Sequence, residues 1–368
     1  MRNLTKFALT GAVALLLAGC GSNNDGGATT NNDNNNADSG ISTPSGRIHL
    51  FNWGYFIDPD LLVQFEEETG IEVMQSLYSS NEEMYSRFVA GTDLFDVMVP
   101  SDYMIDRLIQ EELLRPLNWD NIPNVEHINT RLMDRPFDRG NVFSMPYKWG
   151  TLGILYNTTM VNHEVNSWDS LFNPDYAGEI LMYNSERDAF VVPFARLGFS
   201  LNTTNQDEID QARDMLIDQM PLVKAYVTDQ VMDMMADGQA AMALVYSGDA
   251  SHTILDNSDL NYVIPQEGSN LWINSLVIPH NSPNPEAAEV FLNFMMRPDV
   301  AAQNTDWVGY TTVNQTAIDE GLIDEELVAL SSFNITDEDY NRLEVFVDLG
   351  PERELITNAF TQVLASGH

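Results

Sequence analysis

From Ile48 onward, short apolar runs alternate with stretches in which apolar residues recur at helical spacing. The runs "RIHLFNW" and "IEVMQSLY" are typical of strands, and the helical pattern "DLLVQFEEET" lies between them. The pattern "NEEMYSRFVAG" then leads to "LFDVMVP", which is typical of a buried parallel strand, and "SDYMIDRLIQEELL" restarts a helix. This βαβαβα order predicts a doubly wound α/β domain.

Local signals mark the ends of the first two helices. Asp58 and Pro59 have the residue types of an N-cap and a first helical position, and Gly70 is a typical C-terminal stop. Asn81 is the expected cap of the second helix. The first helix therefore begins directly after the exit of the first strand.

The alternation continues through the rest of the chain. The segment "FSMPYKWGTLGILYN" predicts strands, "SWDSLFNPDYAGEILMYN" a helix, a turn and a strand, and "RDAFVVPFARLGF" a helix. A further helix and strand are expected in "DQVMDMMADGQAAMALVYSGDAS", and an apolar strand in "LWINSLVIP". The segment "NPEAAEVFLNFMMRPDVAAQN" predicts a helix interrupted at Arg297-Pro298, followed by a helical tail.

The first residues have the pattern of a bacterial lipoprotein signal. Arg2 and Lys6 precede an apolar stretch too short to span a bilayer, and it ends in "LAGC" at Cys20, the only cysteine. We expect a signal peptide at 1–19 and lipidation of Cys20; a plain secretory signal with an incidental cysteine is the alternative. Residues 20–46 are rich in Asn, Gly, Asp, Ser and Thr, which predicts a flexible tether. Only the lipid anchor is expected to touch a membrane.

The charge is strongly one-sided, with 17 Lys and Arg against 55 Asp and Glu, and a net charge of −38. The acids are spread along the whole chain, which favours an acidic surface adapted to salt over an acidic face that collects cationic ligands. Nucleic-acid binding is excluded by either interpretation, because it needs a basic surface.

Aromatic residues and acids recur where the predicted strands end. In a parallel sheet, ligands bind outside the carboxyl ends of the strands. Aromatic faces with carboxylates beside them suit an ammonium ligand, because the rings attract the cation and the acids neutralise it. Each exit taken alone is more typical of core packing, but several share this chemistry: 52–56, 100–103, 183–188, 246–249, 271–274 and 309–311.

Signs of catalysis are missing from the sequence. The six histidines are scattered with no two at metal-ligand spacing, so no metal site is expected. Neither a phosphate-binding glycine loop with a lysine nor a G-x-S-x-G motif is present. We therefore expect a binding protein without a cofactor rather than an enzyme.

From about Ile48 to its end, the chain resembles the spermidine/putrescine-binding proteins of bacterial ABC importers. The resemblance rests on "LFNWGYFIDPDLLVQFEEETGIEV", "YSSNEEMYSRFVAG", "FDVMVPSDYMIDRL", "FSMPYKWGTLGILYN", "SWDSLFNPDYAGEI", "LWINSLVIP" and "FLNFMMRPDVA". It implies a type II periplasmic binding protein, in which two doubly wound α/β lobes are joined by a hinge. The implied lobes are 47–151 with 275–331, and 152–274 with 332–368.

The resemblance also implies the ligand contacts. Trp53 and Trp272 match tryptophans of the family, whereas Phe56 stands where many members have a tyrosine. Gly54 and Tyr55 replace a short polar residue and an acid of the family, so the role of Tyr55, as a ligand contact or as a packing residue, stays open. The other implied contacts are Ser101, Tyr103, Asp188, Tyr246, Asp249, Asn274 and Tyr310.

Asn274 and Ser185 are departures from the family pattern, because each stands where polyamine-binding members carry an aspartate. An amide at 274 brings no charge to an ammonium group. A charge-assisted hydrogen bond contributes about 1.5–3 kcal/mol against ~1 for a neutral one. The ligand could therefore be a diamine held by other acids, a monoamine or an amino-acid-like solute.

The expected function is that of a monomeric, lipid-anchored receptor of the periplasm or cell envelope. It would capture a small cationic amine, most simply a polyamine, and deliver it to an ABC permease driven by a separate ATPase. A sensor that reports polyamine to a membrane signalling partner and a hydrolase of an amine-containing substrate are the alternatives.

The net charge of −38 predicts that salt stabilises the ligand-free protein. Salt screens repulsion among surface carboxylates, so raising NaCl from about 0.1 M to about 2 M should raise the melting temperature of the ligand-free protein. Calorimetric scans across this range test it, and a melting temperature that falls with added salt would contradict it.

Overall fold

The computed structural model describes residues 46–367. The expected signal peptide, Cys20 and nearly all of the expected tether lie outside these residues. Gly46, assigned to the tether, begins the first strand instead. Within 46–367, no helix is long and apolar enough to cross a membrane.

The first part of the chain has the predicted βαβαβα order. The helix α1 begins at Pro59 with the Asp58 side chain accepting a hydrogen bond from the backbone of Asp60, and ends at Gly70 in the left-handed conformation, as predicted. The elements up to the middle of the chain are β1 (Gly46–Trp53), α1 (Pro59–Thr69), β2 (Ile71–Tyr78), α2 (Asn81–Ala90), β3 (Val97–Met98), α3 (Asp102–Gln110), the 3₁₀ helices η1 (Trp119–Asn121), η2 (Pro123–His127) and η3 (Thr130–Leu132), and β4 (Ser144–Asn157).

The middle of the chain adds a second set of strands and helices. It contains η4 (Trp168–Phe172), η5 (Pro174–Tyr176), β5 (Ile180–Tyr183), α4 (Glu186–Leu197), α5 (Gln206–Gln219), η6 (Met220–Leu222), β6 (Val223–Val227), α6 (Gln230–Ala236), β7 (Met242–Tyr246), α7 (Ser247–Asp256), β8 (Leu260–Val263) and β9 (Ser269–Val277).

The last part of the chain is mainly helical, as expected. It comprises α8 (Pro285–Met295), α9 (Pro298–Val308), α10 (Gln315–Asp319), α11 (Glu325–Val328), α12 (Asp337–Asn341), β10 (Leu343–Glu344), η7 (Gly350–Glu352) and α13 (Arg353–Ser366). The predicted interruption at Arg297-Pro298 separates α8 from α9.

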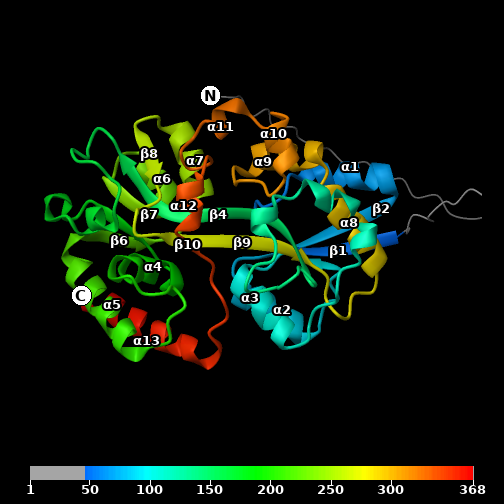
Figure 1. Cartoon of the computed structure of the whole chain (residues 1–368), viewed down its shortest axis with the longest axis horizontal. Helices are drawn as coiled ribbons and strands as arrows, with labels where there is room; N and C mark the ends of the chain where they lie inside the picture. The colour runs from blue at the N-terminus through cyan, green and yellow to red at the C-terminus, as the bar shows by residue number, and fades with distance from the viewer. Residues whose placement is uncertain (1–45, 368) are drawn as a thin grey trace, which may run out of the picture. The chain divides into compact units, whose positions relative to one another are not determined.

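All ten strands form one sheet with two parallel parts. The main path runs β2-β1-β3-β9-β4-β7-β5-β6, with β10 paired to β9 and β8 to β4. The strands β1, β2 and β3 are parallel, and so are β5, β6 and β7. The long strands β4 and β9 pair antiparallel between these two groups, and Figure 1 shows them running from one group of helices to the other.

The hydrophobic core is divided along β4. Residues of β4 up to Trp149 pack in a first core with β1, β3 and α1 to α3, whereas residues from Leu152 onward pack in a second core with α4, α5 and α13. A smaller core lies under α6 and α7. Leu271 to Ile273 of β9 pack in the first core, although the expected lobe boundary places them in the second lobe. Both expected lobes thus meet along β4 and β9.

Two local predictions were wrong. The cap of α2 is Ser80, whose side chain accepts from the backbone N–H of Glu83, and Asn81 is the first helical residue. The helix expected in "SWDSLFNPDY" is replaced by η4 and η5, because the side chains of Ser167 and Asn173 cap two separate short turns. Pro174 begins the second of these turns, where its fixed backbone angle suits a first helical position.

Phe65 of α1 provides a test of the first core. Its buried ring lies edge-on at 5.2 Å from the ring of Phe291 and also 5.2 Å from that of Phe294. Phe65→Ala should lower the free energy of unfolding by about 3–5 kcal/mol, because it removes buried area and leaves a cavity. The control is Val63→Ala on the same helix, whose side chain is 56% exposed, with an expected change within ~0.5 kcal/mol. Equal losses in urea unfolding would contradict this packing.

Candidate ligand-binding site

Trp272 of β9 lies at the centre of a group of aromatic rings. Its ring meets that of Tyr310 edge-on with centroids 5.2 Å apart, and that of Tyr246 with centroids 6.1 Å apart. Tyr246 is the last residue of β7, and Tyr310 follows α9. The indole Nε1 of Trp272 is buried and makes no hydrogen bond to any residue that the structure describes. Three of the strand exits predicted from the sequence, at 246–249, 271–274 and 309–311, therefore lie together.

Two glycines permit this close approach of the rings. A Cβ atom at Gly150 would lie 2.5 Å from Cζ2 of Trp272. A Cβ atom at Gly248 would lie 2.0 Å from a ring carbon of Tyr310. Any larger residue at these positions would force the aromatic rings to move.

Each of the two tyrosines is bonded to an aspartate. Tyr246 Oη donates to Asp188 Oδ2 at 2.7 Å, and Tyr310 Oη donates to Asp249 Oδ1 at 2.6 Å. Burial raises the pKa of Asp188 above its ordinary value, although the hydrogen bond from Tyr246 opposes this. Burial likewise raises the pKa of Asp249 to about 6, although the hydrogen bond from Tyr310 acts to lower it. Neither carboxylate makes an ion pair with a residue in 46–367, so a cation would stabilise both.

Ser101 and Tyr103 lie together at the start of α3. Asn81 joins them, because its Nδ2 donates to Ser101 Oγ and to Tyr103 Oη, both at 3.0 Å. Tyr103 Oη in turn donates to Glu82 at 3.1 Å. Tyr103 packs against both main cores, so it lies where the two parts of the fold meet. Asn81 was expected only as a helix cap, and its role in this network was missed.

Phe56 and Trp53 differ in their relation to the aromatic group. The Phe56 ring is 5.9 Å from that of Tyr310 and so joins the group. The Trp53 ring instead lies 4.7 Å from that of Tyr78, and its Nε1 donates to the carbonyl of Val99 at 2.8 Å. Trp53 is partly exposed at the end of β1, and its aromatic partner is Tyr78, whereas Tyr246 and Tyr310 are the ring partners of Trp272.

Asn274 connects the two groups through β9. Its backbone forms an antiparallel bridge with Ser101. Asn274 also follows Trp272 by two positions on β9, so their side chains lie on the same face of the strand. Asn274 is 8% exposed, and its Oδ1 has no hydrogen-bond partner among the described residues. An unpaired acceptor therefore lies near the unpaired indole donor.

Two further residues belong to this region. Tyr183 at the end of β5 lies 5.1 Å from the Tyr246 ring, and burial followed by the charges of Asp249 and Asp188 raises its pKa. Asp102 is buried and accepts from the backbone N–H groups of Tyr103 and Ile273, and burial raises its pKa to about 7. The exit at Tyr183 was visible in the sequence, but the burial of Asp102 had no sequence signal.

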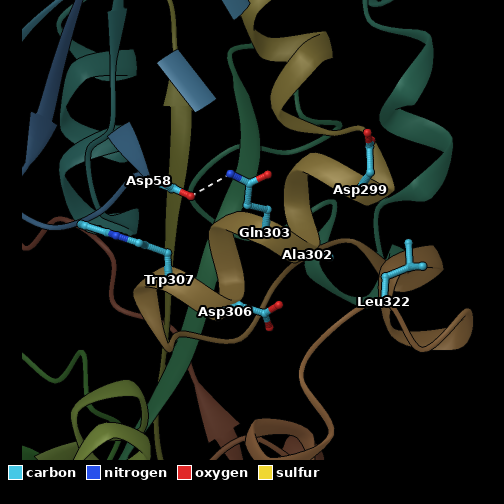
Figure 2. Close-up of a pocket in the computed structure, with 7 residues that line it drawn as sticks. All are labelled: Asp58, Asp299, Ala302, Gln303, Asp306, Trp307 and Leu322. Atoms are coloured by element: carbon cyan, nitrogen blue, oxygen red, sulfur yellow. Dashed lines mark hydrogen bonds between the residues drawn. The ribbon is translucent and has the colours of Figure 1, made fainter. Parts of the chain in front are cut away.

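Tyr55 does not pack in the interior of the protein, which was one of the two roles left open for it. Its side chain is 89% exposed, its φ is +53°, and its ring lies 6.2 Å from that of Trp307. Figure 2 shows Trp307 beside Asp58, which accepts a hydrogen bond from Gln303 at 2.8 Å. They line a groove of about 570 Å³ beside α9, and none of the predicted contacts lines it.

The aromatic group and its acids suit a small organic cation. Rings that meet at right angles offer faces to an alkyl chain, and carboxylates held by tyrosine hydroxyls offer charge to an ammonium group. Within 46–367, no three His, Cys, Asp or Glu side chains are grouped so as to hold a metal ion.

Residues 60–329 match the family model described as bacterial extracellular solute-binding protein. The chain belongs to this family. A spermidine/putrescine-binding periplasmic protein of Escherichia coli K12 is 35% identical over 272 residues, which are 73% of this chain and 78% of the relative. A putrescine-binding periplasmic protein of Pseudomonas aeruginosa is 29% identical over 336 residues, covering 86% and 91% of the two chains.

The solved structures agree with this assignment. The structure of a spermidine/putrescine ABC transporter substrate-binding protein from Streptococcus pneumoniae matches with a TM-score of 0.81 and 37% identity, over 88% of this chain and all of the other. This solute-binding protein has the predicted fold of a type II periplasmic binding protein. The predicted family resemblance is likewise confirmed.

The raised pKa of Asp249 predicts a pH-dependent stability. Its folded pKa of about 6 exceeds the unfolded value of about 4, so its favourable contribution is complete below pH ~4 and is lost as pH rises through ~6. Asp249→Asn should therefore be more stable than the wild type by about 1–2 kcal/mol at neutral pH, with the difference vanishing near pH 4.

Asp256→Asn is the matched control, because it removes the same charge from the exposed end of the same helix. Urea unfolding between pH 4 and pH 7.5 should show a pH-dependent difference only for Asp249→Asn. A difference that stays constant for both variants would contradict the assigned burial of the Asp249 charge.

Proposed function

We propose that this solute-binding protein captures a small cationic amine of the polyamine type and delivers it to an ABC importer. The ligand lies against Trp272, with its alkyl chain on the aromatic rings and an ammonium group at the carboxylates of Asp188 and Asp249. Trp53, Phe56, Ser101, Tyr103 and Asn274 contribute the other wall.

The observation that carries this proposal is the pair of Tyr–Asp hydrogen bonds that border one indole ring. Tyr246 with Asp188 and Tyr310 with Asp249 both border Trp272. Both acids have a raised pKa, because burial removes water that would solvate their charge. An ammonium group stabilises the two carboxylates in place of the water that burial removes. The aromatic rings attract a cation and offer no hydrogen bonds to a neutral polar solute.

The names of the relatives support the same class of ligand. Both proteins aligned above are named for spermidine or putrescine binding, and the Streptococcus pneumoniae structure is named as a substrate-binding protein of an ABC transporter. We assign no catalytic residue and no cofactor to this chain.

The lobes close on the ligand in this proposal. The first lobe comprises 47–151 and 275–331, and the second 152–274 and 332–368. Tyr310 lies on the first lobe and bonds to Asp249 on the second, while β4 and β9 connect the two. A ligand that contacts both lobes favours the closed arrangement, because only that arrangement provides all its contacts.

The proposed location is the outer face of a membrane in the periplasm or cell envelope. A signal peptide at 1–19 and lipidation of Cys20 would leave residues 20–45 as a tether. The protein would act as a monomer, meet the membrane only through its lipid, and pass its ligand to a permease with a separate ATPase.

Calorimetry with putrescine, cadaverine, spermidine, spermine and amino acids tests the proposed function. At least one amine should bind, and Asp188→Asn should weaken it about 10- to 100-fold, because a charge-assisted hydrogen bond is lost. Asp256→Asn is the control and should change the affinity less than about 3-fold, because its charge is exposed and screened. Failure of every amine to bind the wild type, or equal effects of both variants, would refute the proposal.

A further inference from the structure

Lys148 of β4 is a buried charge that the proposed contacts leave unexplained. It is 1% exposed and is among the largest fully buried side chains. Its Nζ donates to Thr305 Oγ1 of α9 at 2.9 Å and lies 5.9 Å from the centre of the Tyr147 ring. It makes no ion pair with any carboxylate in 46–367. A lysine buried without a counter-ion costs folding free energy, because its ammonium loses the water that would solvate it.

The pairing of β4 with β9 places Lys148 directly beside the site. Lys148 is the register partner of Asn274, and Gly150 is the partner of Trp272. Paired residues of an antiparallel ladder lie on the same face of the sheet, with Cβ atoms about 5 Å apart. The indole of Trp272 does cover Gly150, so Lys148, Asn274 and Trp272 share one face.

The charges of the site differ between two places. Asp188 and Asp249 are bonded to the two tyrosines whose rings meet that of Trp272. Lys148 and the uncharged Asn274 form the cross-strand pair two residues further along β9, and we call this pair the β9 end of the site. Burial lowers the pKa of Lys148 to about 7, and Asp306 of α9, which lines the groove in Figure 2, opposes this shift. A second ammonium group beside Asn274 would meet a positive charge and no carboxylate from either residue.

We propose that Lys148 is a specificity-determining residue that, with its cross-strand partner Asn274, disfavours a second ammonium group at the β9 end of the site. The site accordingly selects amines by the position of their charge, and holds an ammonium at Asp188 and Asp249. This inference rests on the proposed amine-binding function.

Calorimetry with putrescine and butylamine tests the inference, because the two ligands share a four-carbon chain and differ by one ammonium group. Lys148→Met should tighten putrescine about 10-fold and change butylamine less than about 3-fold, because only putrescine brings a charge to the β9 end. Lys224→Met, which alters an exposed lysine of β6, is the control and should leave the ratio of the two affinities unchanged.

Asn274→Asp adds a second measurement. In the wild-type background the new carboxylate would pair with Lys148, so putrescine should gain less than about 3-fold. In the Lys148→Met background the same substitution should raise the affinity for putrescine about 10-fold or more, because the carboxylate is then free to pair with the ligand. Equal gains in both backgrounds would contradict the coupling of these two residues.

The pH dependence of the two affinities can be measured on the wild type, so this test does not require that a variant folds. It separates an effect of the Lys148 charge from an effect of Lys148 packing, because pH changes only the charge. Between pH 6 and pH 8.5 the ratio of putrescine to butylamine affinity should rise several-fold as Lys148 loses its proton. Titration of Asp188 and Asp249 acts on the ammonium that both ligands share, and Tyr147 and Asp306 are the titratable groups facing Lys148. Asp102, which accepts from the N–H of Ile273 beside Asn274, also titrates in this range, but it does so in the wild type and in Lys148→Gln alike. The rise should therefore be several-fold smaller in Lys148→Gln, which keeps a polar side chain of similar length.

The outcomes are distinguishable from failure of the proposed function. Amine binding with an affinity ratio that is unchanged by pH and by Lys148→Met overturns this inference and leaves the function in place. Binding of neither amine, nor of spermidine, by the wild type or any variant overturns the function and the inference with it.

Discussion

The antiparallel ladder between β4 and β9 joins two parallel groups of strands in one sheet. On one side β9 pairs with β3, and on the other β4 pairs with β7. Without this ladder the first core and the second core would have no continuous backbone hydrogen bonding between them. The same ladder sets the register that places Trp272 over Gly150 and Asn274 opposite Lys148. The architecture and the site thus depend on one set of hydrogen bonds.

The site concentrates groups that are unfavourable in the ligand-free protein. Asp188, Asp249 and Asp102 are carboxyls whose pKa values burial raises, and Lys148 is an ammonium whose pKa burial lowers. Each of them costs folding free energy that a hydrophobic side chain would not. A cationic ligand offsets part of that cost for the acids, but not for Lys148. The unequal response of the two ends is the physical basis for discrimination among amines.

Local signals predicted much of the fold. Asp58, Pro59 and Gly70 act within a few residues, and the bounds of α1 followed from them. The apolar alternation likewise located β1 and β2. The 3₁₀ turns at 168–176 were mispredicted, because Ser167 and Asn173 each cap a separate short turn. The cap of α2 was mispredicted, because Ser80 accepts from the N–H of Glu83 while the Asn81 side chain accepts from the N–H of Ser101 in another element.

The sequence by itself determined the order of strands and helices, the aromatic and acidic residues at the strand exits, and the family to which the chain belongs. Only the tertiary structure decided which of those residues meet. It brought Tyr310 to Asp249 across 61 positions of the chain, left Trp53 beside Tyr78, and buried Lys148 opposite Asn274. The reason is that helix and strand signals depend on neighbours along the chain, whereas burial, pKa and ring contacts depend on strand register and on residues far apart in sequence.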